Sequence, residues 1–301
     1  MSTSTVTTTD GKIPAGFVTP GKGAGLLDVW RRRQLLRLLV KKEISVRYRN
    51  SVLGLLWSYF KPMVIFVVQY IALGVILDRG GAVQNYALYM FCGNAIITYF
   101  SEAFGNAARS IVGNADLVKK IYLPRELFPI ACTWVSAVHF LPALVVLLVG
   151  AVYSGWKPSF QALYASVFAF IIVTIFAIGL GLIAACLNVF FRDVENFVDL
   201  LLSILMWLSP VIYTWDLVAK QMPNWAFQIY MSNPITAAIE LFHWAFWYPT
   251  IDHNPSNPAL AHTLAPHLIH HGIVAFIISC ATLAVGAFMF RRLEGKFAQE
   301  L

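Results

Sequence analysis

Six stretches of this chain are long and apolar enough to cross a lipid bilayer as helices. A helix needs about 20 apolar residues to span a hydrocarbon core of about 30 Å. The chain is 58% hydrophobic and 12% charged, whereas about 25% of the residues in a soluble domain are charged. We therefore predict an all-α integral membrane protein with six transmembrane helices. The stretches are approximately residues 58–78, 86–108, 127–153, 160–188, 197–214 and 270–290.

Lysine and arginine residues gather on one side of this arrangement. All but four of the 22 basic residues fall in segments on the same side as the two termini, the exceptions being Arg79, Lys157, Lys220 and the boundary residue Lys61. Basic loops stay in the cytosol, so we predict a multi-pass protein of the cytoplasmic membrane with both termini cytosolic. The asymmetry also accounts for the net charge of +7 without nucleic acid as a partner.

The aromatic-rich stretch 225–248 is not counted as a span. A seventh span here would move the two arginines that follow the sixth stretch to the outside, against the charge distribution. Aromatic rings with polar tips are favoured at the boundary between membrane and water. Asn233 and Pro234 form a good helix start, with an N-cap residue followed by proline at the first helical position. We predict a helix over about 234–247 at the outer membrane interface.

The segment before the first span carries many positive charges. Residues 1–25 lack the apolar core of a signal peptide and are expected to form a disordered cytosolic tail. Residues 26–56 are predicted to contain an amphipathic helix that lies along the cytosolic interface. Arg47, Arg49 and Lys61 form a basic collar around the start of the first span. Two interpretations stay open, because the collar either fixes the topology alone or attracts a lipid diphosphate.

The cytosolic loop 113–126 predicts a short helix. Asn114 is a suitable N-cap residue, and Pro124 ends the helix. An apolar stripe on a short cytosolic helix requires a partner that covers it, either the chain's own interface helix or a separate subunit. We favour the separate subunit. The stripe consists of Leu117, Val118 and Ile121.

Two ionisable residues, Glu102 and His139, lie inside predicted spans. Such groups are costly in a membrane and often functional. A proton relay needs a chain of them, and two isolated groups do not make one. A polar contact between helices and a position along a pathway both stay open for either residue.

Two further clusters have a structural and a chemical interpretation. Asp193 and Glu195 superficially resemble the acidic pair that holds a metal in sugar-nucleotide enzymes. We favour a solvated helix start, because acids suit the first turn of a helix and Arg192 neutralises one of them. His267 and His271 have the spacing of a helical zinc site, but we favour histidines at the membrane interface.

The chain is predicted to carry no catalytic residue, cofactor or metal of its own. Residues 16–22 match most of a phosphate-binding P-loop, but Gly23 stands where a magnesium-binding Ser or Thr is needed, and no apolar strand precedes it. The four cysteines lie in apolar segments without a CxxC pair, which favours free buried thiols over a disulfide or a metal site.

Several motifs together resemble the ABC-2-type permeases, the membrane subunits of ABC exporters for O-antigen, capsule, teichoic acid and related polysaccharides. The similarity extends from about residue 27 to 295. Among relatives, the chain is most similar to the actinobacterial, mycobacterial-type permease that exports lipid-linked galactan for the cell wall. The motifs are Arg47-Tyr48-Arg49, Ser51, Leu53-Gly54, Trp57 and Pro62, then Arg192-Asp193, then Ser209 to Tyr213, and Asn233-Pro234.

This resemblance implies a transport subunit rather than an enzyme. It implies a homodimer with two copies of a separate ABC ATPase, which holds the ATP and magnesium. The implied substrate is a glycan linked to polyprenyl diphosphate, met by the basic collar and surrounded by membrane lipid. The transmembrane domain would cover 57–295, followed by a cytosolic tail at 296–301.

The resemblance also implies roles for particular segments. The interface helix would cover 27–49, and the first and fifth spans would line the channel. The coupling helix on the ATPase would use Asn114, Leu117, Val118, Ile121 and Tyr122. The periplasmic gate region 215–268, with helices near 216–222 and 234–247, would include Trp215, Asn233, Pro234, Glu240 and Trp244. Aromatic residues that either stack on sugar rings or only pack are Trp57, Tyr59, Phe60, Trp207 and Tyr213.

Two other functions are weighed against transport by an ABC exporter. A membrane-embedded glycosyltransferase acting on polyprenyl-linked sugars needs a carboxylate arrangement with room for a donor, and only Asp193 and Glu195, at a tight turn, come near it. A secondary transporter usually shows internal repeats with broken helices at matched positions. The sequence shows no convincing repeat.

Overall fold

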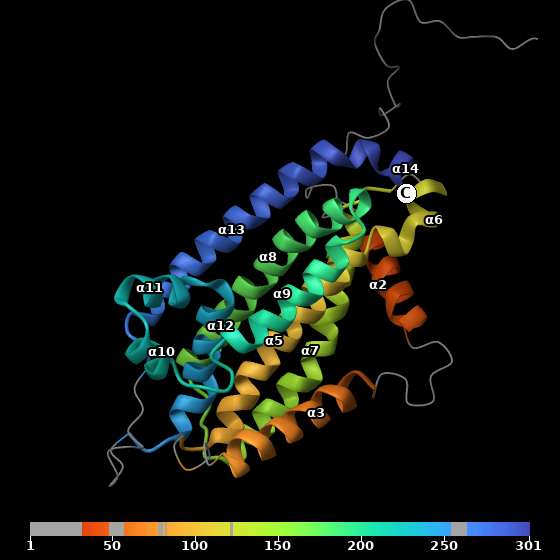
Figure 1. Ribbon diagram of the computed structural model, residues 1–301. Coiled ribbons are helices and arrows are strands. Elements are labelled where there is room, and N and C mark those ends of the chain that lie inside the picture. The colour runs from red at the N-terminus through yellow and green to blue at the C-terminus, as the bar shows by residue number, and fades with distance from the viewer. Residues whose placement is uncertain (1–31, 48–56, 78–80, 82, 121–122, 254–263) are drawn as a thin grey trace, which may run out of the picture.

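The computed structural model describes residues 32–47, 57–77, 81, 83–120, 123–253 and 264–301, and every regular element within these ranges is a helix. Figure 1 shows an elongated bundle. Helices α2 (Arg33–Arg47), α6 (Ala115–Lys120) and α14 (Phe297–Glu300) lie at one end of it. Helices α10 (Trp215–Gln221) and α11 (Asn224–Ser232) lie at the other end.

Each of the six predicted stretches contains a long helix. The helices are α3 (Trp57–Gln69) continued by the π-helix η2 (Tyr70–Ile76), α5 (Tyr86–Arg109), α7 (Leu127–Tyr153), α8 (Phe160–Phe190), α9 (Val194–Leu208) and α13 (Leu268–Leu293). By length and hydropathy alone, three segments of the described chain qualify as spans, namely Leu127–Tyr153, Phe160–Phe190 and Leu268–Lys296. The number six therefore stays a prediction, because α9 has only 15 residues and α5 carries polar residues.

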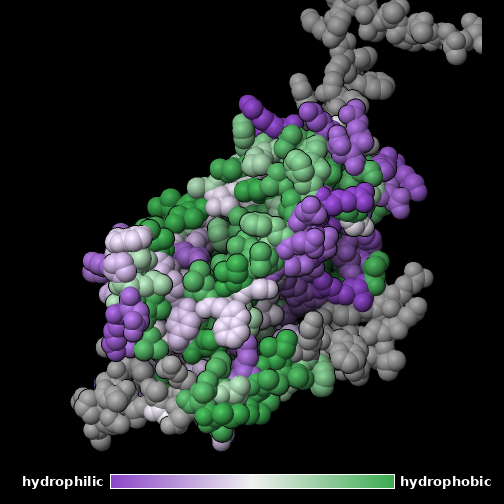
Figure 2. All heavy atoms as spheres, in the orientation of Figure 1, coloured by the Kyte–Doolittle hydropathy of each residue, from purple (hydrophilic) through white to green (hydrophobic). Residues whose placement is uncertain are grey.

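The distribution of polar residues over the surface fits a membrane-embedded bundle. Figure 2 shows apolar residues over the middle of one face and hydrophilic residues toward its two ends. Large apolar side chains are exposed along α3, α7, α9 and α13. A soluble protein rarely exposes apolar surface on this scale, so the surface is suited to lipid or to another subunit.

Small residues bring α8 close to its neighbours. A Cβ atom added to Gly179 would lie 2.7 Å from the backbone nitrogen of Leu283 in α13, and one added to Gly286 would lie 2.5 Å from the Gly179 carbonyl oxygen. On the other side, a Cβ atom on Gly181 would lie 2.6 Å from the Cβ of Ala107 in α5. Close backbone contact through small residues is how helices associate tightly in a membrane, where water does not drive them together.

The predicted helix at 234–247 is present, but its surroundings differ from the prediction. It consists of α12 (Pro234–Phe242) and the π-helix η4 (His243–Trp247). All residues of both segments are buried, and α12 packs against α5, α8 and α13 rather than along the membrane interface. Even its polar residues Thr236 and Glu240 are buried, so protein encloses the helix on all sides. Its start is as predicted, because the Asn233 side chain accepts a hydrogen bond from the Ile235 amide at 3.0 Å.

The link between α9 and α10 is not helical, and α5 supports it. The Tyr86 hydroxyl donates to the Ile212 carbonyl at 3.0 Å. The Tyr89 hydroxyl lies 2.8 Å from the Tyr213 carbonyl and 3.2 Å from the Pro210 carbonyl. Unpaired backbone groups are costly inside a membrane protein, so these tyrosines permit a break in the helix at this depth.

Candidate functional site

Three charged or titratable side chains meet where the C-terminal end of α2 reaches α5 and α7. The Arg47 Nη1 atom donates a hydrogen bond to Glu102 Oε1. The Nδ1 atom of His139 lies 2.6 Å from the same oxygen and 3.1 Å from Arg47 Nη1. A polar contact between helices was one of the two roles left open for Glu102 and His139, and the structure shows this contact between α5 and α7. Helix α2 joins α7 at this point, and the sequence gives no sign of that contact.

A cavity of about 370 Å³ begins at this cluster and lies among α3, α5, α7 and α9. Its polar lining residues include Glu102, His139, Ser101 and Thr98, together with Asn94, which lies eight positions before Glu102 in α5. The remainder is mostly apolar and is lined by residues including Met63, Phe66, Phe91, Val146, Leu202 and Met206. A cavity with one charged end and apolar walls suits an amphiphilic molecule.

The basic collar is described only in part. Arg47 belongs to the cluster with Glu102, so its charge is already partnered. Arg49 lies outside the described residues, and so does the side chain of Lys61, although its backbone belongs to α3. The diphosphate role of these two residues stays a prediction.

The predicted channel aromatics are arranged in different ways. The side chains of Trp57 and Tyr59 lie outside the described set. Phe60 is 55% exposed and Trp207 is 67% exposed, so both rings are accessible. The Tyr213 hydroxyl donates to the carbonyl oxygens of Trp207 and Leu208 at 3.1 and 2.8 Å. The Tyr213 hydroxyl therefore provides a hydrogen-bond partner for carbonyl groups at the C-terminal end of α9. The sequence did not indicate this structural role.

The chain itself covers the described part of the apolar stripe on α6. Val118 is buried in a cluster with Leu39 of α2, Leu127 and Phe290, and Leu117 packs against the same cluster. This favours the chain's own helices over a separate subunit as the covering partner. The other side of α6 is exposed and polar, and it presents Asp116, Lys119 and Lys120. Ile121 and Tyr122 lie outside the described residues.

Asn114 does not cap α6 through its side chain. It is buried, its Oδ1 atom accepts a hydrogen bond from Lys42 Nζ, and its amide donates to the Ser110 carbonyl at 2.9 Å. Asn114 instead connects α2 to the short η3 helix (Val112–Asn114). Its side chain bonds to Lys42 of α2 on one side and to the carbonyl of Ser110, directly after α5, on the other. This contact joins segments that lie 72 positions apart in the sequence.

The acidic residues at the start of α9 form an ion-pair network with α5. Arg109 Nε donates to Glu195 Oε1 at 2.5 Å, and Arg109 Nη2 lies 2.6 and 2.7 Å from the two Asp199 oxygens. Glu195 is thus partnered by Arg109, whereas the sequence analysis assigned the neutralisation of one of the two acids, Asp193 or Glu195, to Arg192. The network supports a structural role for this turn rather than a metal-binding acid pair. Arg109 and Asp199 were missed, because Asp199 lies beyond the first turn of α9 and Arg109 belongs to another helix.

Glu240 and His243 form a second buried pair in the gate region. His243 Nε2 lies 3.1 Å from the Tyr89 carbonyl oxygen, and the two rings stack with centroids 3.9 Å apart. His243 Nδ1 lies 3.5 Å from Glu240 Oε1. Neither of these two atoms has a hydrogen-bond partner among the described residues. The histidine was not identified from the sequence, where a Glu and a His three positions apart was the only signal.

The Tyr89 carbonyl oxygen decides how the His243 ring is oriented. A carbonyl oxygen only accepts, so the Nε2 atom that faces Tyr89 must carry hydrogen. The other ring nitrogen, Nδ1, then faces Glu240 Oε1 at 3.5 Å. Burial raises the pKa of the nearby Tyr230 hydroxyl, and Tyr213 and Glu240 add to the rise. Tyr230 therefore stays neutral and contributes no charge to the pair.

The remaining predicted gate residues are part of the packing. Trp215 lies with its ring centroid 6.2 Å from that of Phe227, and Trp244 meets Tyr164 edge to face at 5.6 Å. The Trp156 indole nitrogen donates to the Ala245 carbonyl at 2.8 Å and so supports η4.

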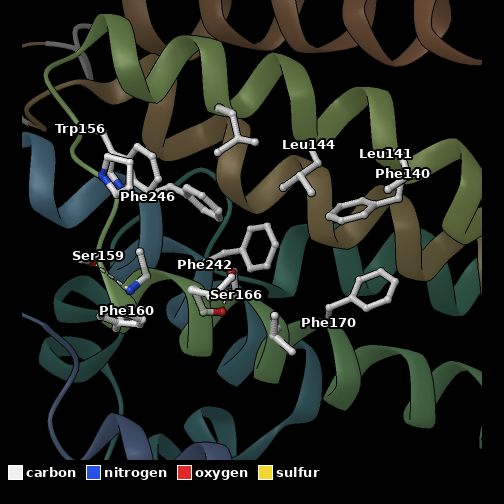
Figure 3. A pocket seen from close by; sticks show the side chains of 15 residues that line it. Phe140, Leu141, Leu144, Trp156, Ser159, Phe160, Ser166, Phe170, Phe242 and Phe246 are labelled. Atoms are coloured by element: carbon white, nitrogen blue, oxygen red, sulfur yellow. Dashed lines mark hydrogen bonds between the residues drawn. The ribbon is translucent and has the colours of Figure 1, made fainter.

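An apolar groove of about 620 Å³ lies between α7 and α8 (Figure 3). Phe140, Leu144, Trp156, Phe242 and Phe246 line it, and aromatic rings from both sides point into it. Nearly all of its lining is carbon. The groove therefore suits the hydrocarbon chain of a lipid better than a sugar.

The described outer histidines make pairwise ring contacts. His270 and His271 are in edge contact with centroids 5.8 Å apart, and His253 lies against Tyr248 at 4.5 Å. His262 lies outside the described residues. Within the part of the chain that the structure describes, no three His, Cys, Asp or Glu side chains are placed to hold a metal ion. The four cysteines are free thiols.

The apolar helices, the break in the α9 region and the buried α12 define a multi-pass helical membrane protein. The sequence pattern of ABC-2 type transporters matches residues 34–247. The chain therefore belongs to the ABC-2 type transporter family.

Several characterised relatives match most of the chain. It is 27% identical over 267 residues to the O-antigen export system permease protein RfbA of Klebsiella pneumoniae, a match that covers 89% of this chain and 95% of the relative. It is 30% identical over 187 residues to an RfbA protein of Myxococcus xanthus, covering 62% and 70% of the two chains. The capsule polysaccharide export inner-membrane protein CtrC of Neisseria meningitidis is 21% identical over 218 residues, covering 70% of this chain and 78% of the relative.

Proposed function

We propose that this chain is the membrane-spanning permease subunit of an ABC exporter that moves a polysaccharide across the cytoplasmic membrane. The observation that carries the proposal is the extent of the similarity to an O-antigen export permease, 89% of this chain and 95% of the relative. In this family the ATPase is a separate subunit, which binds ATP and magnesium, so this chain is not itself the enzyme.

The arrangement of the exporter follows from this assignment. We propose a homodimer of this chain with two ATPase subunits and with both termini in the cytosol. The location of α2, α6 and α14 at one end of the bundle supports this orientation, because the most basic segments then lie together (Figure 1). The exposed apolar surfaces of α3 and α9 are suited to lipid and to a second copy of the chain.

The substrate that we propose is a polyprenyl-diphosphate-linked glycan of the galactan type. A lipid diphosphate has a charged head and a long apolar tail. The cavity among α3, α5, α7 and α9 has the matching combination of a polar end beside Arg47 and apolar walls. The alternative of a glycosyltransferase loses support, because Glu195 is engaged by Arg109.

Reconstitution of transport tests the proposal. The chain is co-expressed with the ABC ATPase encoded beside it and placed in liposomes with a lipid-linked galactan. ATP-dependent movement of the glycan, abolished when the Walker A lysine of the ATPase is replaced, is the expected result. Movement or synthesis of glycan by this chain alone, without a nucleotide-hydrolysing partner, would contradict the proposal.

The structure changes which residues of α6 are expected to meet the ATPase. The double replacement Lys119→Glu and Lys120→Glu reverses charge on its exposed face, and like charges across an interface suppress association. We expect ATPase co-purification to fall at least about tenfold, a change of about 1.4 kcal/mol in binding free energy. The measurement is the ratio of ATPase to permease in an affinity-purified complex.

A matched control separates this effect from a general charge effect. Lys220→Glu reverses one lysine charge on exposed α10 at the opposite end of the bundle and should leave the ratio unchanged. Val118→Asp, by contrast, should lower the yield of folded permease because Val118 is buried in the chain's own core. An unchanged ratio in the Lys119 and Lys120 variant would exclude this face as the docking surface.

A further inference from the structure

The cluster of Arg47, Glu102 and His139 has the geometry of an anion site that the protein's own carboxylate fills. Glu102 Oε1 accepts a hydrogen bond from Arg47 and lies 2.6 Å from His139 Nδ1. A carboxylate oxygen accepts from both, so His139 donates through Nδ1. Two donors from two different helices, α2 and α7, thus converge on a single anionic oxygen of a third.

The surroundings of this oxygen favour an exchangeable anion over a permanent structural pair. The His139 side chain is only 3% exposed, so its position is fixed by the protein. Arg47 and Glu102 keep partial exposure, and Glu102 lines the cavity among α3, α5, α7 and α9. A second anion arriving through that cavity therefore meets both donors as soon as the Glu102 side chain turns away.

The cavity also indicates what kind of anion fits. Ser101 and Thr98 add hydroxyl groups at the polar end, and such groups donate to phosphate oxygens. Beyond them the walls are formed by Phe66, Phe91 and Met206. A small inorganic anion would leave the apolar part of the cavity empty. A lipid phosphate would fill the polar part with its head group and the apolar part with its hydrocarbon tail.

We propose that Arg47 and His139 bind a phosphate oxygen of the lipid carrier, and that Glu102 takes the place of this oxygen when the site is empty. This inference rests on the proposed function and adds to it. His139 becomes a ligand for the substrate, and Glu102 becomes a competitor that limits affinity. A limited affinity for the lipid carrier suits a transporter, because the carrier must leave the site again.

Binding of farnesyl diphosphate to the full-length chain in nanodiscs of zwitterionic lipid tests this. Glu102→Gln removes the competing charge and preserves side-chain size, so farnesyl diphosphate should bind at least about tenfold more tightly than to the unmodified chain. The double variant Glu102→Gln with Arg47→Gln should lose this gain, because a donor is missing. Glu195→Gln is the matched control, since it removes a carboxylate that pairs with Arg109 outside the cavity, and it should bind as the unmodified chain does.

Two further probes separate the contributions of head and tail. Inorganic pyrophosphate and farnesol should each bind more weakly than farnesyl diphosphate, and the Glu102→Gln change should leave farnesol binding unaltered. If inorganic pyrophosphate bound as tightly as farnesyl diphosphate, the apolar walls of the cavity would not contribute to binding, and the cavity would not be part of the site. Unchanged or weaker farnesyl diphosphate binding by a monodisperse Glu102→Gln variant would overturn the proposal.

This experiment can fail independently of the proposed function. If ATP-dependent export proceeds and Glu102→Gln does not tighten binding, the site assignment fails and the exporter assignment stands. If the predicted binding pattern is found but no export occurs with the ATPase, the lipid-phosphate site stands without the transport function.

Discussion

Replacing Gly179 by alanine is expected to disrupt the packing of α8 against α13. The new Cβ atom would lie 2.7 Å from the Leu283 nitrogen and 2.8 Å from the Thr282 carbonyl carbon. Both are backbone atoms, so one whole helix must shift rather than one side chain. Overpacking a tight contact typically costs about 1–3 kcal/mol, and we expect the upper part of this range.

The thermal unfolding of purified protein in detergent measures this loss, together with the monodisperse fraction on gel filtration. Gly150→Ala is the matched control, because Gly150 lies in α7 and the nearest atom to its added Cβ, Leu88 Cδ1, is 3.9 Å away. This control should be neutral or more stable, since alanine favours a helix over glycine by about 0.5–1 kcal/mol. Equal stability of the two variants would show that the close contact between α8 and α13 does not determine the stability of the protein.

Replacing Glu240 by alanine is the second change with a large expected effect. It removes the carboxylate that faces His243 Nδ1 at 3.5 Å in a buried position and creates a cavity beside the ring. Removing one member of a buried ionisable pair costs about 3–5 kcal/mol. We expect the variant to lose most of its thermal stability in detergent and to accumulate as aggregate on expression.

Glu240→Gln tests whether this position needs a negative charge or only a polar side chain of the same size. The amide group donates a hydrogen bond to Nδ1 as a protonated carboxyl does, so this variant should remain within about 1 kcal/mol of the unmodified chain, a cost typical of an isosteric change. If glutamine proved as damaging as alanine, a full negative charge would be required at this position. If both variants were stable, the pair would not contribute to holding α12 and η4 in place.

The sequence predicted the helices well because apolar length is a local property. The ends of α7 (Leu127–Tyr153) agree with the predicted 127–153, and the cap at Asn233 was identified from a local motif. The location of α12 could not be found in the same way. Aromatic residues suit both a membrane interface and a protein interior, and only the positions of α5, α8 and α13 decide between these environments.

The candidate site was harder to predict than the fold, because its residues are far apart in the sequence. Arg47, Glu102 and His139 come from three helices and meet only after α2 folds onto α7. Each residue was noticed separately, as a basic flank or as an ionisable group within a span. The pairing of Arg109 with Glu195 and Asp199 has the same origin. The apolar stripe on α6 was recognised, but the sequence did not reveal that Leu39 and Phe290 cover it.

In the exporter that we propose, the early end of α9 would shorten the apolar path that a polar molecule follows along this helix through the hydrocarbon core. With 15 residues at a rise of 1.5 Å each, the helix is about 22 Å long, against a hydrocarbon core of about 30 Å. Beyond its last turn, carbonyl groups supported by the hydroxyls of Tyr86 and Tyr89 replace an unbroken apolar wall. In the exporter that we propose, a polymer that follows α9 would therefore reach hydrogen-bonding groups before it has crossed the full thickness of the bilayer.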